Sequence, residues 1–330
     1  MATIPHTFAQ PDLLELALTH ASQERSEDNE RMEFLGEAAF TRAASQLLTR
    51  RKKVIYSLRG HGELDPESRE PGGLSDLAAQ LDMENYALEP LDLYRENDEG
   101  GAPAVPDDAA ALLIARPQGP LTSAENDAVL SYISQGGSVM IWVDPGMPTP
   151  LLLEEMAVDI KEGVAMDRVL IFPHDDRPVA RYRAHAITSE LAEQQLVTVL
   201  DHIAPLAARE DAPGWIRYRP LLETSRQGWI ERGGETDGGK AVYQPDWDGA
   251  GPATMAYALE IRSDENGLVT PGRGLSRVVV VGDSAFASNQ LLAEGPGNVG
   301  FLINAFRWLL KDDMLIASGG FGLCGIPERL

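Results

Sequence analysis

The sequence predicts an α/β fold: a doubly wound, mostly parallel sheet with a more β-rich inserted or edge segment. Three observations predict it. Short apolar runs alternate with amphipathic stretches up to about residue 146, the pattern becomes irregular from about Asp159, and a run of valines ending at Val281 restores the signal of a buried strand. Strand and helix alternating at this spacing favour right-handed crossovers and a sheet covered on both faces.

Seven apolar runs of strand length are expected to form the sheet and its β-rich segment. Turn residues mark their ends, as in the Gly-His-Gly-Glu that follows the first run and the Asp-Pro-Gly that follows the fourth. The expected strands are residues 53–58, 86–93, 110–115, 138–143, 215–222, 254–261 and 277–281.

Three amphipathic stretches, residues 74–81, 123–135 and 299–310, are expected to be helices. Ser123 is expected to cap the second of them, with the Glu125 carboxylate in the first turn complementing exposed amide groups. Two glycines then end that helix, because glycine most easily takes the left-handed conformation found after a helix.

The charge balance argues against nucleic acid as a partner. The 330 residues include 28 Lys and Arg against 51 Asp and Glu, a net charge of −23, which repels phosphate backbones and anionic lipid surfaces. The apolar runs are far shorter than a membrane-spanning helix, and no secretory signal is visible, so the chain as written is expected to be soluble. Cys324 is the single cysteine, which excludes an internal disulfide.

A set of motifs in the centre of the chain occurs in the order and rough spacing of a known family. They are residues 54–63, 88–93, 105–122, 136–146, 185–188, 220–225 with Trp229, and 277–289. The set resembles the GldG family of ABC-transporter auxiliary proteins, over about residues 45–311.

The resemblance implies a Rossmann-like or glutamine-amidotransferase-like domain, related to a domain of intraflagellar transport proteins. It further implies a non-catalytic auxiliary component of an ABC transport system, as in gliding motility, with ATPase and permease subunits as partners and no cofactor. Family members are membrane-associated with an extracytoplasmic domain. This sequence departs from the family in lacking the transmembrane helices that flank that domain.

Four residues at expected carboxyl ends of strands form the candidate binding site: His61, Glu63, Asp144 and Asp283. Open α/β sheets bind ligands at this edge, so the four are expected to converge on one rim that takes a small molecule, glycan or peptide. In the structural alternative, glycines make the first turn while His61 caps carbonyl groups, and the two aspartates serve a turn and a helix cap.

The segment Gly282-Asp283-Ser284 supplies a rival hypothesis, because it resembles the nucleophile segment of GDS-type serine hydrolases. A serine nucleophile needs a histidine within hydrogen-bonding reach. His185 and Asp144 are the conceivable partners, but the chain order of those enzymes is not reproduced. The competing interpretation is a helix N-cap formed by Asp283 or Ser284. Tyr182 and His185 are candidates for lining a cleft, although a lone histidine is more often structural.

The N-terminal residues 13–22 and 29–37 resemble ribonuclease III, and in that pattern Glu33 and Glu37 match metal-binding positions. Metal-dependent endonuclease activity is the least favoured alternative, because two-metal cleavage needs carboxylates from a second motif that does not follow. Residues 319–328 resemble the glycine-rich loop of CoA-transferase subunits. The expected division is therefore 1–44, 45–311 and 312–330, in a mosaic that is a natural fusion, a gene-assembly artefact or an engineered chain.

Overall fold

The computed structural model describes residues 52–93, 102–169, 178–233, 236–237, 240–262 and 275–311. The chain divides into two units, Met1–Lys52 and Lys53–Leu330, and the fold below is that of the described part of the second. The ribonuclease III-like segment with Glu33 and Glu37 lies outside the described residues, as does the CoA-transferase-like segment with Cys324.

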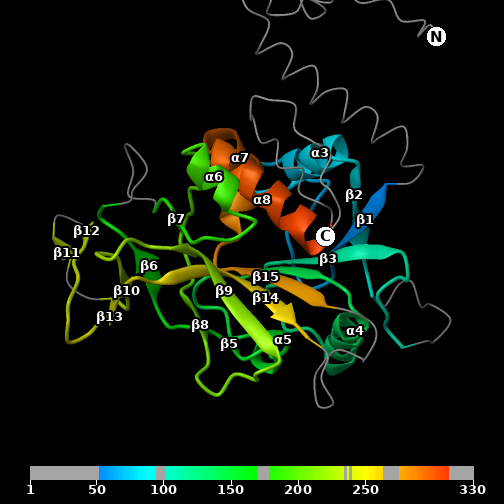
Figure 1. The fold of residues 1–330 in the computed structure, drawn as a ribbon, viewed down its shortest axis with the longest axis horizontal. Coiled ribbons are helices and arrows are strands. Elements are labelled where there is room, and N and C mark those ends of the chain that lie inside the picture. Colours follow the sequence, from blue (N-terminus) through cyan, green and yellow to red (C-terminus); the bar gives the residue numbers. More distant parts are fainter. Residues whose placement is uncertain are drawn as a thin grey trace, which may run out of the picture. The chain divides into compact units, whose positions relative to one another are not determined.

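A ten-stranded mixed sheet forms the centre of this unit (Figure 1). Its parallel part consists of β1 (Lys53–Leu58), β2 (Tyr86–Leu91), β3 (Ala109–Ala115), β4 (Val139–Trp142) and β15 (Ser276–Val281), in the order β2-β1-β3-β4-β15. The predicted α/β class is confirmed, and the late valine-rich strand lies within the sheet, beside β4.

Antiparallel strands extend the sheet beyond β15. They are β14 (Thr254–Ile261), β9 (Ile216–Glu223), β7 (Arg181–Tyr182), β8 (Leu206–Ala208) and β5 (Val158–Ile160). The predicted β-rich segment is thus the edge of the same sheet. Short strands also pair outside it: β6 (Val164–Met166), β10 (Trp229–Glu231) and β13 (Gly249–Ala250) in one group, and β11 (Thr236–Asp237) with β12 (Lys240–Ala241) in another.

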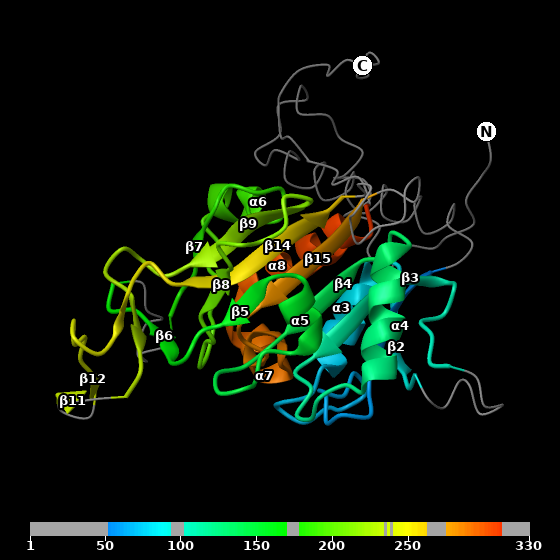
Figure 2. The ribbon, with the colours of Figure 1, turned by 90° about the horizontal axis from the view of Figure 1, so that it is seen from below.

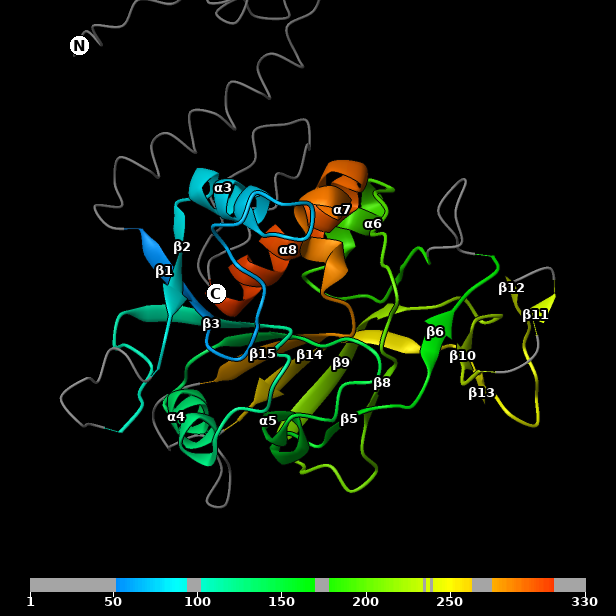
Figure 3. The same ribbon diagram turned by 180° about the vertical axis from the view of Figure 1, so that it is seen from behind.

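Helices cover both faces of the sheet, as a doubly wound arrangement requires. Figures 1 and 3 show one group above the sheet, and Figure 2 shows the other group on the near side when the sheet is seen from below. The first group is α3 (Ser75–Met83), α6 (Ser189–Glu193), α7 (Asn289–Glu294) and α8 (Pro296–Leu309), preceded by the 3₁₀ turn η2 (Ala285–Ala287), and the second is α4 (Ser123–Ser134) with α5 (Leu151–Glu155).

Successive strand residues contribute to two hydrophobic cores, one on each face. In β1, for example, Ile55 belongs to the core under α3 and α8, whereas Tyr56 belongs to the core under α4 and α5. This alternation follows from the two-residue repeat of a strand. Phe301 and Phe306 of α8 are fully buried in the first core, where truncation of a large aromatic side chain typically costs about 3–5 kcal/mol.

The start of α4 differs from the expectation by one residue. Thr122, and not Ser123, is the N-cap: its hydroxyl accepts from the Glu125 amide, and the Glu125 carboxylate accepts from the Thr122 amide at 2.8 Å. Both residues are good caps, but only Thr122 stands three residues before a glutamate, the spacing of a capping box. Gly136 ends the helix with a φ of 93°, as predicted. Within the described residues, no helix is both long and apolar enough to cross a bilayer.

Candidate functional site

The strand order places the topological switch point of the sheet between the carboxyl ends of β1 and β3. From β1 the chain passes through α3, on one face, to β2, whereas from β3 it passes through α4, on the other face, to β4. Doubly wound sheets bind their ligands at such a switch point. The two loops are joined there, because the amides of Gln118 and Gly119 donate to the His61 carbonyl at 2.7 and 3.1 Å.

His61 is held at the switch point between two buried carboxylates. Its Nδ1 lies 3.3 Å from Glu63 Oε1 and its Nε2 lies 3.1 Å from Glu125 Oε2. The carboxylate side chains are 1% and 3% exposed, against 14% for the imidazole. Glu63 also accepts from the His61 amide at 2.7 Å, so ring and backbone are fixed together. Both ring nitrogens therefore have partners within the protein.

Glu125 was missed as a member of this cluster. The sequence shows it as a residue of the first helical turn, and the structure gives it that role through the Thr122 amide and hydroxyl, each 2.8 Å from its Oε2. The same oxygen meets His61, a residue 64 positions earlier in the chain. The Thr-x-x-Glu spacing could have located the buried carboxylate, but not its partner.

Asp144, Asp283 and Ser284 form a second cluster at the ends of β4 and β15. The Ser284 amide donates to Asp144 Oδ1 and its hydroxyl donates to Asp144 Oδ2, both at 2.8 Å. The fully buried Asp283 carboxylate accepts from the Asp201 and Ala285 amides, both at 2.7 Å. Burial raises the pKa of Asp283 well above its usual range, and nearby Asp144 acts in the same direction.

Arg116, which sequence reasoning also missed, follows β3 and pairs with this second cluster. Its Nε lies 3.8 Å from Asp144 Oδ2, and its backbone has a φ of 57°. A non-glycine residue in this left-handed region is uncommon and is held there by its surroundings. The Nε atom is buried and has no hydrogen-bond partner.

The four residues predicted from the sequence therefore lie at carboxyl ends of parallel strands, in two clusters. Beside β1, His61 contacts Glu63 and Glu125. Beside β4 and β15, Asp144 accepts from Ser284 and lies near Asp283. Within the described part of the chain, no group of three or more His, Cys, Asp or Glu side chains is arranged to hold a metal ion.

Ser284 and His185 have different partners in the structure. The Ser284 hydroxyl donates to Asp144, whereas His185 packs its ring edge-on against Trp308, with ring centroids 5.1 Å apart, and accepts from the Ile187 amide. Burial lowers the pKa of His185. Tyr182 bonds to Thr198 at 2.8 Å. The Asp283 carboxylate accepts from the Ala285 amide at the start of η2, and the N-cap position is Ser284, whose side chain makes no capping hydrogen bond.

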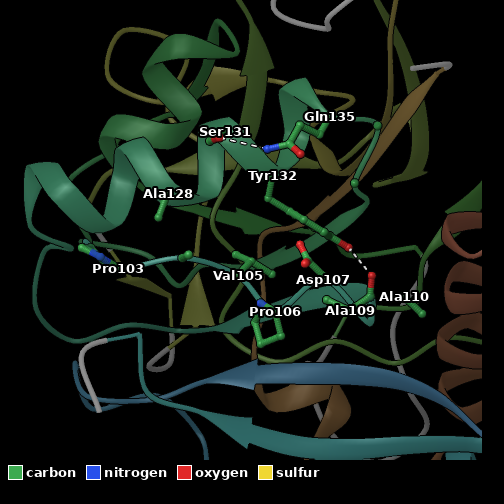
Figure 4. Close-up of a pocket in the computed structure, with 13 residues that line it drawn as sticks. Pro103, Val105, Pro106, Asp107, Ala109, Ala110, Ala128, Ser131, Tyr132 and Gln135 are labelled. Carbon is green, nitrogen blue, oxygen red and sulfur yellow. Dashed lines mark hydrogen bonds between the residues drawn. The ribbon is translucent and has the colours of Figure 1, made fainter. Parts of the chain in front are cut away.

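A cavity of about 440 Å³ lies at the amino end of β3, away from the carboxyl-end rim (Figure 4). It is lined by the loop and strand start at residues 103–110 and by residues 128–137 at the end of α4. None of the four predicted site residues lines it.

The fold and the rim define a doubly wound α/β domain in which the ionisable groups of the carboxyl edge contact one another. Residues 52–168, which carry the switch point, match the model of an auxiliary-protein family described as an ABC-type uncharacterized transport system. The match covers less than half of the chain. No curated protein matches the chain.

Solved structures with a similar fold include the mmIFT52 N-terminal domain, at 16% identity and a TM-score of 0.55, covering 79% of this chain and 99% of that one. The cytoplasmic protein STM1381 from Salmonella typhimurium LT2 is 12% identical with a TM-score of 0.43, covering 78% and 98%. A ThuA-like protein from Parabacteroides merdae is 12% identical with a TM-score of 0.39, covering 79% and 90%. At 16% identity, the likeness to the mmIFT52 domain concerns the fold alone.

Proposed function

We propose that this protein is a non-catalytic binding or scaffolding component of an ABC-type transport system, of the GldG type that serves gliding motility. The observation that carries the proposal is the family match over residues 52–168, because that segment contains β1 to β4 and the loops of the switch point. In this proposal the domain works at a membrane, on the extracytoplasmic side, beside ATPase and permease subunits.

The rim supplies the contacts that this role needs. Arg116 and Asp144 are 34% and 24% exposed. The His61 ring is fixed by Glu63 and Glu125, so an approaching ligand meets a preorganised surface. A peptide segment, a glycan or a small molecule with acceptor oxygens fits the partly exposed Arg116 guanidinium. The net charge of −23 disfavours nucleic acid.

The test is co-purification from the membranes of cells that express the full chain with an affinity tag. After mild cross-linking and detergent extraction, an ABC ATPase and a permease are expected to be enriched together, in comparable amounts, relative to an untagged control. Recovery of the chain without either subunit would contradict the proposal.

A further inference from the structure

The cavity at the amino end of β3 is lined mostly by uncharged residues. Its walls come from the loop before β3, the first residues of β3 and the last turns of α4 (Figure 4). Among the thirteen lining residues, Asp107 is the one with a charged side chain, and none is Lys or Arg. Asp107 is exposed, so its carboxylate remains accessible from the solvent.

The helix that forms one wall adds further negative potential. α4 is 12 residues long and ends at Ser134, so its last turn faces the cavity through Ser131, Tyr132 and the C-cap residue Gln135. The C-terminal end of a helix carries a partial negative charge from carbonyl groups that lack helical partners. A basic residue in the last turn commonly compensates for it, and α4 has none there.

Tyr132 gives the cavity a fixed, neutral wall. Its hydroxyl donates to the Ala109 carbonyl at 3.2 Å, which joins α4 to the start of β3 (Figure 4). Burial raises the pKa of Tyr132 to about 12, so the phenol stays uncharged at physiological pH. The ring also packs closely on Gly137, where an added Cβ would lie 2.5 Å from the ring carbons.

We propose that this cavity binds a cationic group, an ammonium or a guanidinium, carried by a small-molecule amine or by a basic peptide side chain. The Asp107 carboxylate supplies the ion pair, and the side-chain amide oxygen of Gln135, at the end of α4, is a further acceptor. The volume is in the range of small-ligand sites. The net charge of −23 draws cations towards the molecule.

Calorimetric titration of the full chain tests the proposal with two cationic probes and a neutral isostere. The probes are agmatine and the peptide acetyl-glycyl-arginyl-glycinamide, and the isostere is the same peptide with citrulline in place of arginine. Both cations are expected to bind, and the citrulline peptide is expected to bind at least about tenfold more weakly than the arginine peptide. If the arginine peptide binds more tightly than agmatine, the site is assigned to a protein partner. If agmatine binds more tightly, the site is assigned to a free amine.

Two substitutions that remove one negative charge each separate the cavity from the general field of the protein. Asp107→Asn is expected to weaken agmatine binding about fivefold to tenfold, because it removes the ion pair. Asp127→Asn, at an exposed position of α4 outside the cavity lining, is the matched control and is expected to change binding less than about twofold. Equal effects of the two substitutions would overturn the proposal.

Gln135→Lys supplies a tethered cation to the same place. It is expected to abolish binding of both probes and to leave the melting temperature unchanged or raised, since a cation at a helix C-terminus is favourable. This readout distinguishes blockage from unfolding. Undiminished binding in Gln135→Lys, equal binding of citrulline and arginine peptides, or no heat from either cation would each overturn the proposal.

Discussion

Asp283 is the residue whose environment departs furthest from that of an ordinary surface carboxylate. It is fully buried, accepts two backbone amides and lies near Asp144. The carboxylate joins the Asp201 backbone to the start of η2, and in this way fixes the loop that carries Ser284. Its burial is a cost that the two amide donors offset only in part, because its pKa remains raised.

The raised pKa of Asp283 predicts a pH-dependent stability. The folded protein takes up this proton at a higher pH than the unfolded chain, whose aspartate titrates near about 3.9. The free energy of unfolding linked to the group therefore rises as the pH falls through the folded-state pKa, and levels below the unfolded value. Urea unfolding is expected to show that, as the pH falls from about 8 to about 4, the free energy of unfolding of wild type rises relative to that of Asp283→Asn. A pH-independent difference would be inconsistent with this burial.

Ser284 is predicted to be unreactive as a nucleophile. Its hydroxyl donates to the Asp144 carboxylate and not to a histidine, the base that usually activates a serine nucleophile. A labelled fluorophosphonate is expected to mark wild type and Ser284→Ala equally, at background level. Labelling of wild type that disappears in Ser284→Ala would restore the hydrolase alternative.

At the scale of elements, the start of α4 couples a helix cap to the switch point. Thr122→Ala is expected to lower the free energy of unfolding by about 1 kcal/mol, because the Glu125 amide loses its acceptor and the Glu125 carboxylate loses a donor. Ser123→Ala is the matched control and should cost less than about 0.5 kcal/mol, since Ser123 is exposed and already helical. If urea unfolding shows a larger loss of stability for Ser123→Ala than for Thr122→Ala, Ser123 and not Thr122 is the N-cap.

Asn289, at the start of α7, clamps the loop that follows β1. Its Oδ1 accepts from the Asp76 amide at 2.9 Å, and its Nδ2 donates to the Ser68 and Glu70 carbonyls at 3.0 and 2.7 Å. Asn289→Ala is expected to cost about 2–3 kcal/mol in the free energy of unfolding, because the Asp76 amide and the Ser68 and Glu70 carbonyls lose their partners. Gln290→Ala, which removes one exposed contact, should cost less than about 0.5 kcal/mol. Equal costs would show that the clamp does not stabilise the loop.

The sequence predicts the long elements well and the short ones poorly. β1, β9 and β14 appear as apolar or alternating runs, which the two-residue repeat of a strand makes visible. β7 has two residues and β8 has three, too few for any period to show. The Asn289 clamp is also invisible from the sequence, because its partners lie more than 200 positions away.

At the scale of the whole molecule, the sheet order explains why the positions of the candidate residues could be predicted in part. The carboxyl ends of parallel strands meet at one edge, so His61, Asp144 and Asp283 could be assigned to that edge from local patterns alone. Their division into two clusters could not be predicted. It depends on the contacts of Glu125 with His61 and of Arg116 with Asp144, which join residues from different elements. The cavity at the opposite edge carried no local signal, because its lining is mostly small uncharged residues.

The most direct test of the proposed role compares how much ABC permease co-purifies with the tagged Arg116→Gln chain and with the tagged Arg226→Gln chain. The two substitutions remove the same charge, one at the rim and one at an exposed turn after β9. If the rim binds the transport machinery, Arg116→Gln should lower permease recovery about tenfold while Arg226→Gln leaves it at the wild-type level, with both chains folded by circular dichroism. Equal recovery with the two variants would contradict a binding role for the rim.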